Sequence, residues 1–183
     1  MDEDFSNASA IQLFKEYVQV KTYNDVEVAV EAFLLVVSIQ CGLDFERVDQ
    51  RNRDGISRPI FILTLRGREP SVGSLLLLGH VDMESSEHYP DVVKLKNGRI
   101  YWRGTEMSTR NIWFAYLCAL DRLVHRQKTP SKDPFVPLFR RTVHIRMIVS
   151  TEKRISGGTI AEFVISPKFQ ELLPAFAPDV SSP

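Results

Sequence analysis

The chain has 183 residues, 44% of them hydrophobic and 25% charged, which is typical of one globular domain rather than of a disordered or fibrous protein. Its 23 basic and 23 acidic residues give a formal net charge of zero, which argues against a basic nucleic-acid-binding surface. The apolar runs are far shorter than the ~20 residues that a membrane-spanning helix requires. We therefore expect no nucleic-acid partner and no membrane partner.

The N-terminus and the cysteines both indicate the cytoplasm. The chain starts with Met-Asp-Glu-Asp, which is acidic where a signal or transit peptide would be basic. Cys41 and Cys118 lie in apolar helical contexts, and neither has a neighbour at the spacing of a metal or redox pair. We expect both thiols to be reduced core residues of a cytoplasmic protein.

Two helices are expected in the first part of the chain. Ser9 and Gln12 form a capping-box pattern, and the apolar residues that follow predict a helix over residues 10–20. A second helix is expected over residues 26–41, ending at Gly42. Because nearly all of its positions are apolar, we expect this second helix to be buried over most of its circumference.

Three strands are expected next, at residues 44–48, 59–66 and 74–79. The Arg-Asp-Gly sequence at 53–55 predicts a turn between the first two strands. Four consecutive leucines at 75–78 are typical of a strand that is covered on both faces in an α/β sheet. The carboxyl end of such a strand is where open α/β sheets place their chemistry.

The second half of the chain mixes further strands and helices. We expect a hairpin over 91–102 around Asn97-Gly98, a helix from Ser108 or Thr109 to about Gln127, a loop over 129–141, a strand to residue 150, a helix from Gly157-Gly158 to about Val164, and a short helix over 167–173. No linker divides the chain. The order predicts one α/β domain over residues 1–183, with a layered sheet.

The strongest local signal is Gly79-His80-Val81-Asp82, which directly follows the leucine-rich strand. A histidine at a strand end can offer an imidazole nitrogen to a metal, and an aspartate two residues later can orient a catalytic group. Taken alone, this pattern is weak evidence, because an isolated His-x-Asp is more often structural or incidental. His144 alternates with core residues on a later strand, so we expect it to be structural.

Several segments around this motif carry a resemblance to a known family. They are the strand and motif at 75–82, the aromatic-Arg-Gly segment at 100–104, the helix at 116–123, Arg141 to His144, Phe163-Val164, and Ser166 to Phe169. Their order and spacing resemble the zinc-dependent aminoacylase and carboxypeptidase metallopeptidases, which include acetylornithine deacetylase, with the aminoacylases nearest. The resemblance runs from about Leu13 to Asp179. It implies a mixed sheet with helices on both faces, the fold of a zinc-peptidase catalytic domain.

The resemblance also implies a chemistry. Family members use two zinc ions to cleave N-acyl amino acids, with a metal-activated water and a glutamate that moves the proton. His80 corresponds to the first metal ligand, and Asp179 to a later one. Glu152 corresponds to the general base, and Asp82 to the acid that orients it. Zinc and an N-acyl-L-amino acid are the cofactor and substrate that the resemblance implies.

The sequence departs from the family pattern at two ligand positions. Met107 stands where the family has an aspartate that bridges the metals, and Glu106, one position earlier, is a weak candidate to replace it. Lys153 stands where a second glutamate binds zinc, and an ammonium group has no lone pair for a metal. The resemblance further implies that the lid domain and the later catalytic segments lie beyond Pro183, so we expect a partial catalytic domain.

Three functions remain open on this basis. The first is a degenerate aminoacylase-like protein with little or no hydrolase activity. The second is a metal-dependent hydrolase that another chain completes. The third is a binding or regulatory partner of a full-length relative without enzymatic activity. An incomplete sheet exposes an edge and apolar surface, so we expect homo- or hetero-oligomers.

Overall fold

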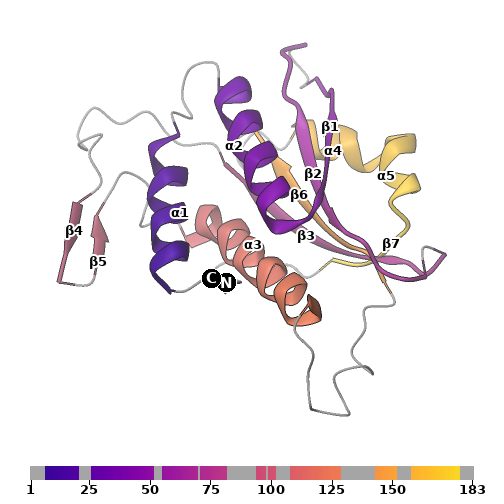
Figure 1. Cartoon of the computed structure of the whole chain (residues 1–183). Coiled ribbons are helices and arrows are strands. Elements are labelled where there is room, and N and C mark those ends of the chain that lie inside the picture. The colour runs from indigo at the N-terminus through magenta and orange to yellow at the C-terminus, as the bar shows by residue number, and fades with distance from the viewer. Residues whose placement is uncertain are drawn as a thin grey trace.

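The computed structural model describes residues 7–20, 26–51, 55–69, 71–81, 94–97, 99–101, 108–128, 143–151 and 158–177. Its elements are α1 (Asn7–Gln19), α2 (Val26–Cys41), β1 (Asp44–Val48), β2 (Ile60–Leu65), β3 (Ser74–His80), β4 (Lys94–Lys96), β5 (Arg99–Tyr101), α3 (Ser108–Lys128), β6 (Ile145–Ser150), α4 (Gly158–Val164), α5 (Pro167–Glu171) and β7 (Pro174–Phe176) (Figure 1). Among these helices, none is long and apolar enough to cross a membrane.

Five strands form a mixed sheet in the order β1-β2-β6-β3-β7. The pairs β1·β2 and β2·β6 are antiparallel, whereas β3 runs parallel to both β6 and β7. β4 and β5 form a separate antiparallel pair. The strand β6 therefore joins an antiparallel half of the sheet to a parallel half, although it comes late in the chain.

Helices cover both faces of this sheet. Alternate strand residues point to opposite sides, so the strands contribute apolar side chains to two separate cores. On one face, Phe61, Leu63 and Leu77 join a core with α1, α2 and α3. On the other face, Ile62 and Ile148 join a second core with α4 and α5. Figure 1 shows the three longer helices in front of the sheet and the two short ones behind it. The expected α/β fold, a mixed sheet with helices on both faces, is confirmed.

Most elements lie where the sequence predicts them, but one helix begins earlier and one strand is unexpected. α1 begins at Asn7, so Ser9 lies inside the helix and is not its cap. Instead of completing a capping box, the Gln12 amide donates a hydrogen bond to Glu16 Oε1, one turn later, at 3.0 Å. β7 was not expected at all. The predicted loop at 129–141 lies outside the described residues.

One expectation of burial is wrong, and a second, the strand covered on both faces, holds except at one residue. α2 buries one face against the sheet, but Val28 and Ile39 on its other face are each 72% exposed. An apolar sequence showed that the helix could be buried, not that neighbours would cover it. Leu78 on β3 is 42% exposed, although its neighbours Leu76 and Leu77 are buried. It lies on the face of α4 and α5, which do not cover it completely.

The amino end of β3 is held to β7 by a partly buried polar network. Ser74 Oγ donates to Leu172 O at 2.6 Å, and Arg146 Nη1 donates both to Ser74 Oγ and to Leu172 O. The Ser74 amide donates to Leu173 O at 2.6 Å. Beside them, a Cβ on Gly73 would lie far inside van der Waals contact with the side chain of Ala175. The absence of a side chain at residue 73 is what lets the two strands approach.

Candidate functional site

The structure brings two candidate segments together at one edge of the sheet. β3 and β6 are parallel neighbours, and His80, the last residue of β3, pairs with Ser150, the last residue of β6. The amide of Val81 donates to Ser150 O at 3.1 Å, so the alignment continues past the end of the strand. The strands that precede Asp82 and Glu152 thus end side by side at the same edge of the sheet, a proximity that the sequence did not predict.

Most of the predicted site residues lie outside the part of the chain that the structure describes. His80 is described and is half-buried. Those outside it are Asp82, Glu106, Met107, Glu152, Lys153 and Asp179. The roles of these residues therefore stay predictions. The structure establishes only where the strands that precede them end.

Thr151 fixes the point where the chain leaves β6. Its side chain is buried, with 4% of the residue exposed, and Oγ1 donates to Pro59 O at 3.0 Å. Since β2 is antiparallel to β6, Pro59 lies at the same edge of the sheet, one residue before β2 begins. Thr151 thereby ties the segment before Glu152 to β2. The sequence analysis missed this residue, and its one signal was a hydroxyl directly after an apolar strand.

The third strand of the parallel half leads toward the same edge. β7 runs parallel to β3, with Pro174 opposite Ser74 and Phe176 opposite Leu75. Parallel strands run in one direction, so the chain at β7 is heading toward the edge where His80 lies. Asp179, the predicted later ligand, lies outside the described residues, so its role stays a prediction.

The described residues do not form a zinc site by themselves. Within the described ranges, no group of three or more His, Cys, Asp and Glu side chains could hold a metal ion. Structural zinc sites take four protein ligands and catalytic sites take three, whereas His80 is the only predicted ligand in these ranges. We therefore derive no catalytic step through zinc.

The two thiols lie near each other between α2 and α3, and both are free. Burial raises the pKa of Cys41 to about 12, and the nearby Asp121 carboxylate and Cys118 add to the shift. Burial also raises the pKa of Cys118. Both cysteines are thus protonated at neutral pH, which argues against a thiolate nucleophile. Their proximity was not visible in the sequence, because they stand far apart along the chain.

His144 has the structural place that the sequence predicts. Its Nδ1 accepts a hydrogen bond from the amide of Gly67 at 2.9 Å. Burial lowers the pKa of His144, and the cations of Arg146 and Arg66 lower it further, whereas Asp44 opposes them. The neutral imidazole is the form that can accept this bond.

Comparison with known proteins finds similarity both in sequence and in fold. No family model matches the chain. The chain is 30% identical over 180 residues to aminoacylase-1 of Sus scrofa, and 23% identical over 171 residues to aminoacylase-1 of Dictyostelium discoideum. A tripeptidase from Staphylococcus aureus superposes with a TM-score of 0.53 at 19% identity, covering 76% of this chain and 35% of the tripeptidase. The chain is therefore aminoacylase-like in sequence, and it shares its fold with the tripeptidase.

The relatives are considerably longer than this aminoacylase-like chain. The matched region covers 93% of the chain but 40% of the Sus scrofa aminoacylase-1, and 88% of the chain but 38% of the Dictyostelium discoideum protein. LapB from Legionella pneumophila superposes with a TM-score of 0.55 at 12% identity. This superposition covers 94% of the chain and 42% of LapB. The aminoacylase-like chain thus spans about 40% of the length of the curated relatives that it matches.

Proposed function

We propose that this chain is a cytoplasmic aminoacylase-like protein in which hydrolysis of N-acyl-L-amino acids is impaired or lost. The observation that supports the proposal is the alignment of His80 with Ser150, because it sets the ends of the two strands that precede Asp82 and Glu152 beside each other. Two of the ligand positions that the resemblance assigns to this site hold side chains that suit a metal poorly.

Both departures act on the metals that would activate water. An ammonium at Lys153 offers no lone pair and repels a dication, in a position where the family has a carboxylate. A thioether at Met107 is a soft, neutral ligand, whereas a bridge between two zinc ions is made by an anionic carboxylate. With both carboxylates replaced, the general base expected at Glu152 has a weakly activated water at most.

The test compares the chain with variants that restore the carboxylates. We expect the purified chain to release no methionine from N-acetyl-L-methionine above background, with zinc supplied. We expect the double variant Met107→Asp with Lys153→Glu to bind more zinc by elemental analysis than the unchanged chain. Lys153→Gln is the matched control, because it removes the charge without adding a ligand. Enzymatic rates in the unchanged chain that His80→Ala abolishes would refute the proposal.

An open sheet edge favours a second candidate, a hydrolase that another chain completes. All three residues of β7 are exposed, and among the described strands β7 pairs with β3 alone. Such an edge can accept a strand from another chain. Zinc retained through native purification together with a co-purifying full-length relative would support this candidate. The same association without zinc would support the third candidate, a binding or regulatory partner without enzymatic activity.

A further inference from the structure

The loop that joins β2 to β3 is tied to the rest of the chain near both of its ends. Near its start, the amide of Gly67 donates to Nδ1 of His144 at 2.9 Å. Directly after it, the amide of Ser74 donates to the carbonyl oxygen of Leu173, the residue that precedes β7, at 2.6 Å. The loop therefore connects the imidazole of His144 to the attachment of β7.

A second route leads from His144 to β7 through Arg146. The two residues are two positions apart along the chain that forms β6, so both lie on the sheet face of α4 and α5. The guanidinium of Arg146 donates to Ser74 Oγ and to Leu172 O, which hold the start of β7. A positive charge on His144 would repel this guanidinium.

The charges around His144 favour its neutral form. Among the described residues, the charged groups that act on it are Arg146 on β6, Arg66 directly after β2, and Asp44 on β1. Burial lowers the pKa of His144 most, the two arginines lower it further, and Asp44 opposes them while it is ion-paired with Arg66. Neutral Nδ1 accepts the hydrogen bond from Gly67, whereas protonated Nδ1 would be a donor that faces a donor.

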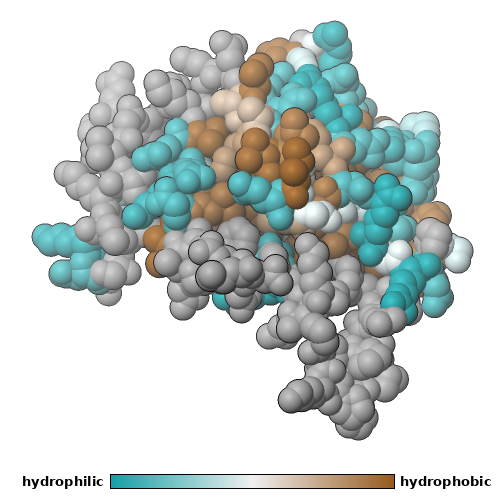
Figure 2. Space-filling model, viewed as in Figure 1, coloured by the Kyte–Doolittle hydropathy of each residue, from teal (hydrophilic) through white to brown (hydrophobic). Residues whose placement is uncertain are grey.

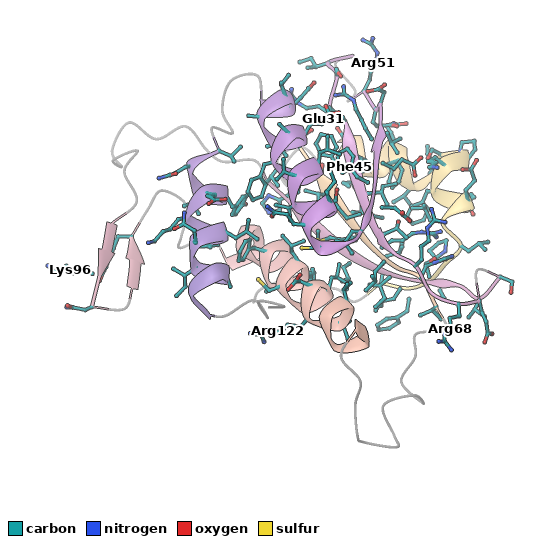
Figure 3. The ribbon with its side chains drawn as sticks, viewed as in Figure 1. Glu31, Phe45, Arg51, Arg68, Lys96 and Arg122 are labelled. Carbon is teal, nitrogen blue, oxygen red and sulfur yellow. The ribbon has the colours of Figure 1, made fainter. Side chains whose placement is uncertain are left out.

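The attachment of β7 is itself strained. Leu173 has a φ of 48°, in the left-handed region that a bulky side chain rarely adopts. All three residues of β7 are exposed, so little buried apolar surface holds the strand in place. Figure 3 shows Arg68 of the loop at the end of the sheet away from Arg51, and Figure 2 shows hydrophilic residues over that end. Water and protons therefore reach this region.

We propose that His144 is an acid-sensitive switch, whose protonation releases the loop before β3 and the attachment of β7 while the carboxyl end of β3 stays paired with β6. Protonation removes the acceptor of the Gly67 amide and places a second cation beside Arg146. At the carboxyl end, the Val81 amide donates to the carbonyl of Ser150, and this bond does not involve the loop. The inference does not depend on whether the chain hydrolyses anything.

Hydrogen exchange of the Gly67, Ser74 and Val81 amides at about pH 7.5 and 5.5 tests the switch. Each rate is expressed as a protection factor, so that the intrinsic pH dependence of exchange cancels. Because His144 titrates near 6.5 when it is released, protection can fall by about tenfold at most between these conditions. We expect a fall of roughly two- to tenfold at Gly67 and Ser74, and no fall at Val81.

Two variants and a control assign the response to His144. His144→Gln, which does not titrate, should remove the pH dependence at Ser74. Arg66→Gln should reduce it, because Arg66 is one of the cations that lower the pKa of His144. A histidine with a merely structural role would not respond to that change of charge. His80→Gln is the matched control, since it removes a half-buried histidine at the other end of β3 and should keep the fall at Ser74.

Three results would overturn the proposal. One is equal protection of Gly67 and Ser74 at both pH values. Another is an equal fall in His144→Gln, which would assign the response to a different group. The third is an equal fall at Val81, which would show a general loosening of the sheet. Thermal melts by circular dichroism at neutral pH check that each variant is folded, and Arg66→Gln changes an exposed side chain, so the test does not depend on one substitution.

Discussion

The two ends of β3 are held in different ways. At the amino end, the lack of a side chain at Gly73 lets β7 approach closely, and the side chains of Ser74 and Arg146 donate hydrogen bonds to the carbonyl of Leu172. At the carboxyl end, where His80 lies, backbone pairing with β6 and the hydroxyl of Thr151 set the position of the chain. The polar network is thus placed away from the candidate chemistry.

This difference shows which substitutions reach the candidate site and which do not. Changes at the amino end should loosen β7 and alter stability while the pairing of His80 with Ser150 persists. Changes at the carboxyl end should act on the route by which the chain leaves β6. Three substitutions separate the two ends, and they are given from the largest expected effect to the smallest.

Gly73→Ala should have the largest effect, a loss of about 2–3 kcal/mol in the free energy of unfolding. The new Cβ would overlap the side chain of Ala175 and lie 3.2 Å from the carbonyl oxygen of Leu173, so β7 must move. Urea denaturation measures the loss. The double variant with Ala175→Gly removes the main overlap and should recover part of it. An unchanged midpoint for Gly73→Ala would show that β7 is not held closely.

Thr151→Val should cost about 1–2 kcal/mol, because it leaves the carbonyl of Pro59 without its buried donor. Hydrogen exchange should also show faster exchange at the Val81 amide, which binds the neighbouring carbonyl of Ser150. Thr151→Ser keeps the hydroxyl and should behave like the unchanged chain. If Thr151→Ser were as damaging as Thr151→Val, the hydrogen bond to Pro59 could not by itself explain the loss.

Protonation of His144, which lies near the amino end of β3, should lower the stability of the chain in acid. Its pKa is lowered in the folded chain from an unfolded value of 6.5, so the unfolded chain binds the proton more readily. Stability should be unaffected by this group above pH 6.5 and fall as pH decreases below it. Urea midpoints at about pH 7.5 and 5.5 measure the effect, and His144→Gln, which does not titrate, should show a smaller difference between them. An equal difference in both proteins would assign the acid sensitivity to other groups.

Much of the fold could be predicted because local patterns determine it. The limits of β1 and α2 match the expected strand and helix. β7 could not be predicted, because three exposed residues that begin with Pro174 have no strand pattern of their own. Its pairing depends on Gly73 and Ser74, about a hundred residues earlier in the chain, so only the tertiary structure reveals it.

The site was predictable only as a set of separate segments. The sequence singled out His80 and Glu152, but their strands are 70 positions apart at His80 and Ser150, and the pairing of those strands is a tertiary property. The same limit explains the error on α2, since Val28 and Ile39 are as hydrophobic as the buried residues of that helix. Periodicity identifies an apolar face, but it does not say whether a neighbour covers it.

The central place of β6 has a consequence for synthesis on the ribosome. β2 and β3 both pair with β6, which is translated after α3 and begins at Ile145. Until that strand leaves the exit tunnel, the β1·β2 hairpin and the leucines of β3 have no partner between them, and unpaired apolar strands are prone to aggregate. The nascent chain therefore has a long interval in which a chaperone is most needed, and the edge that carries His80 is completed only when that interval ends.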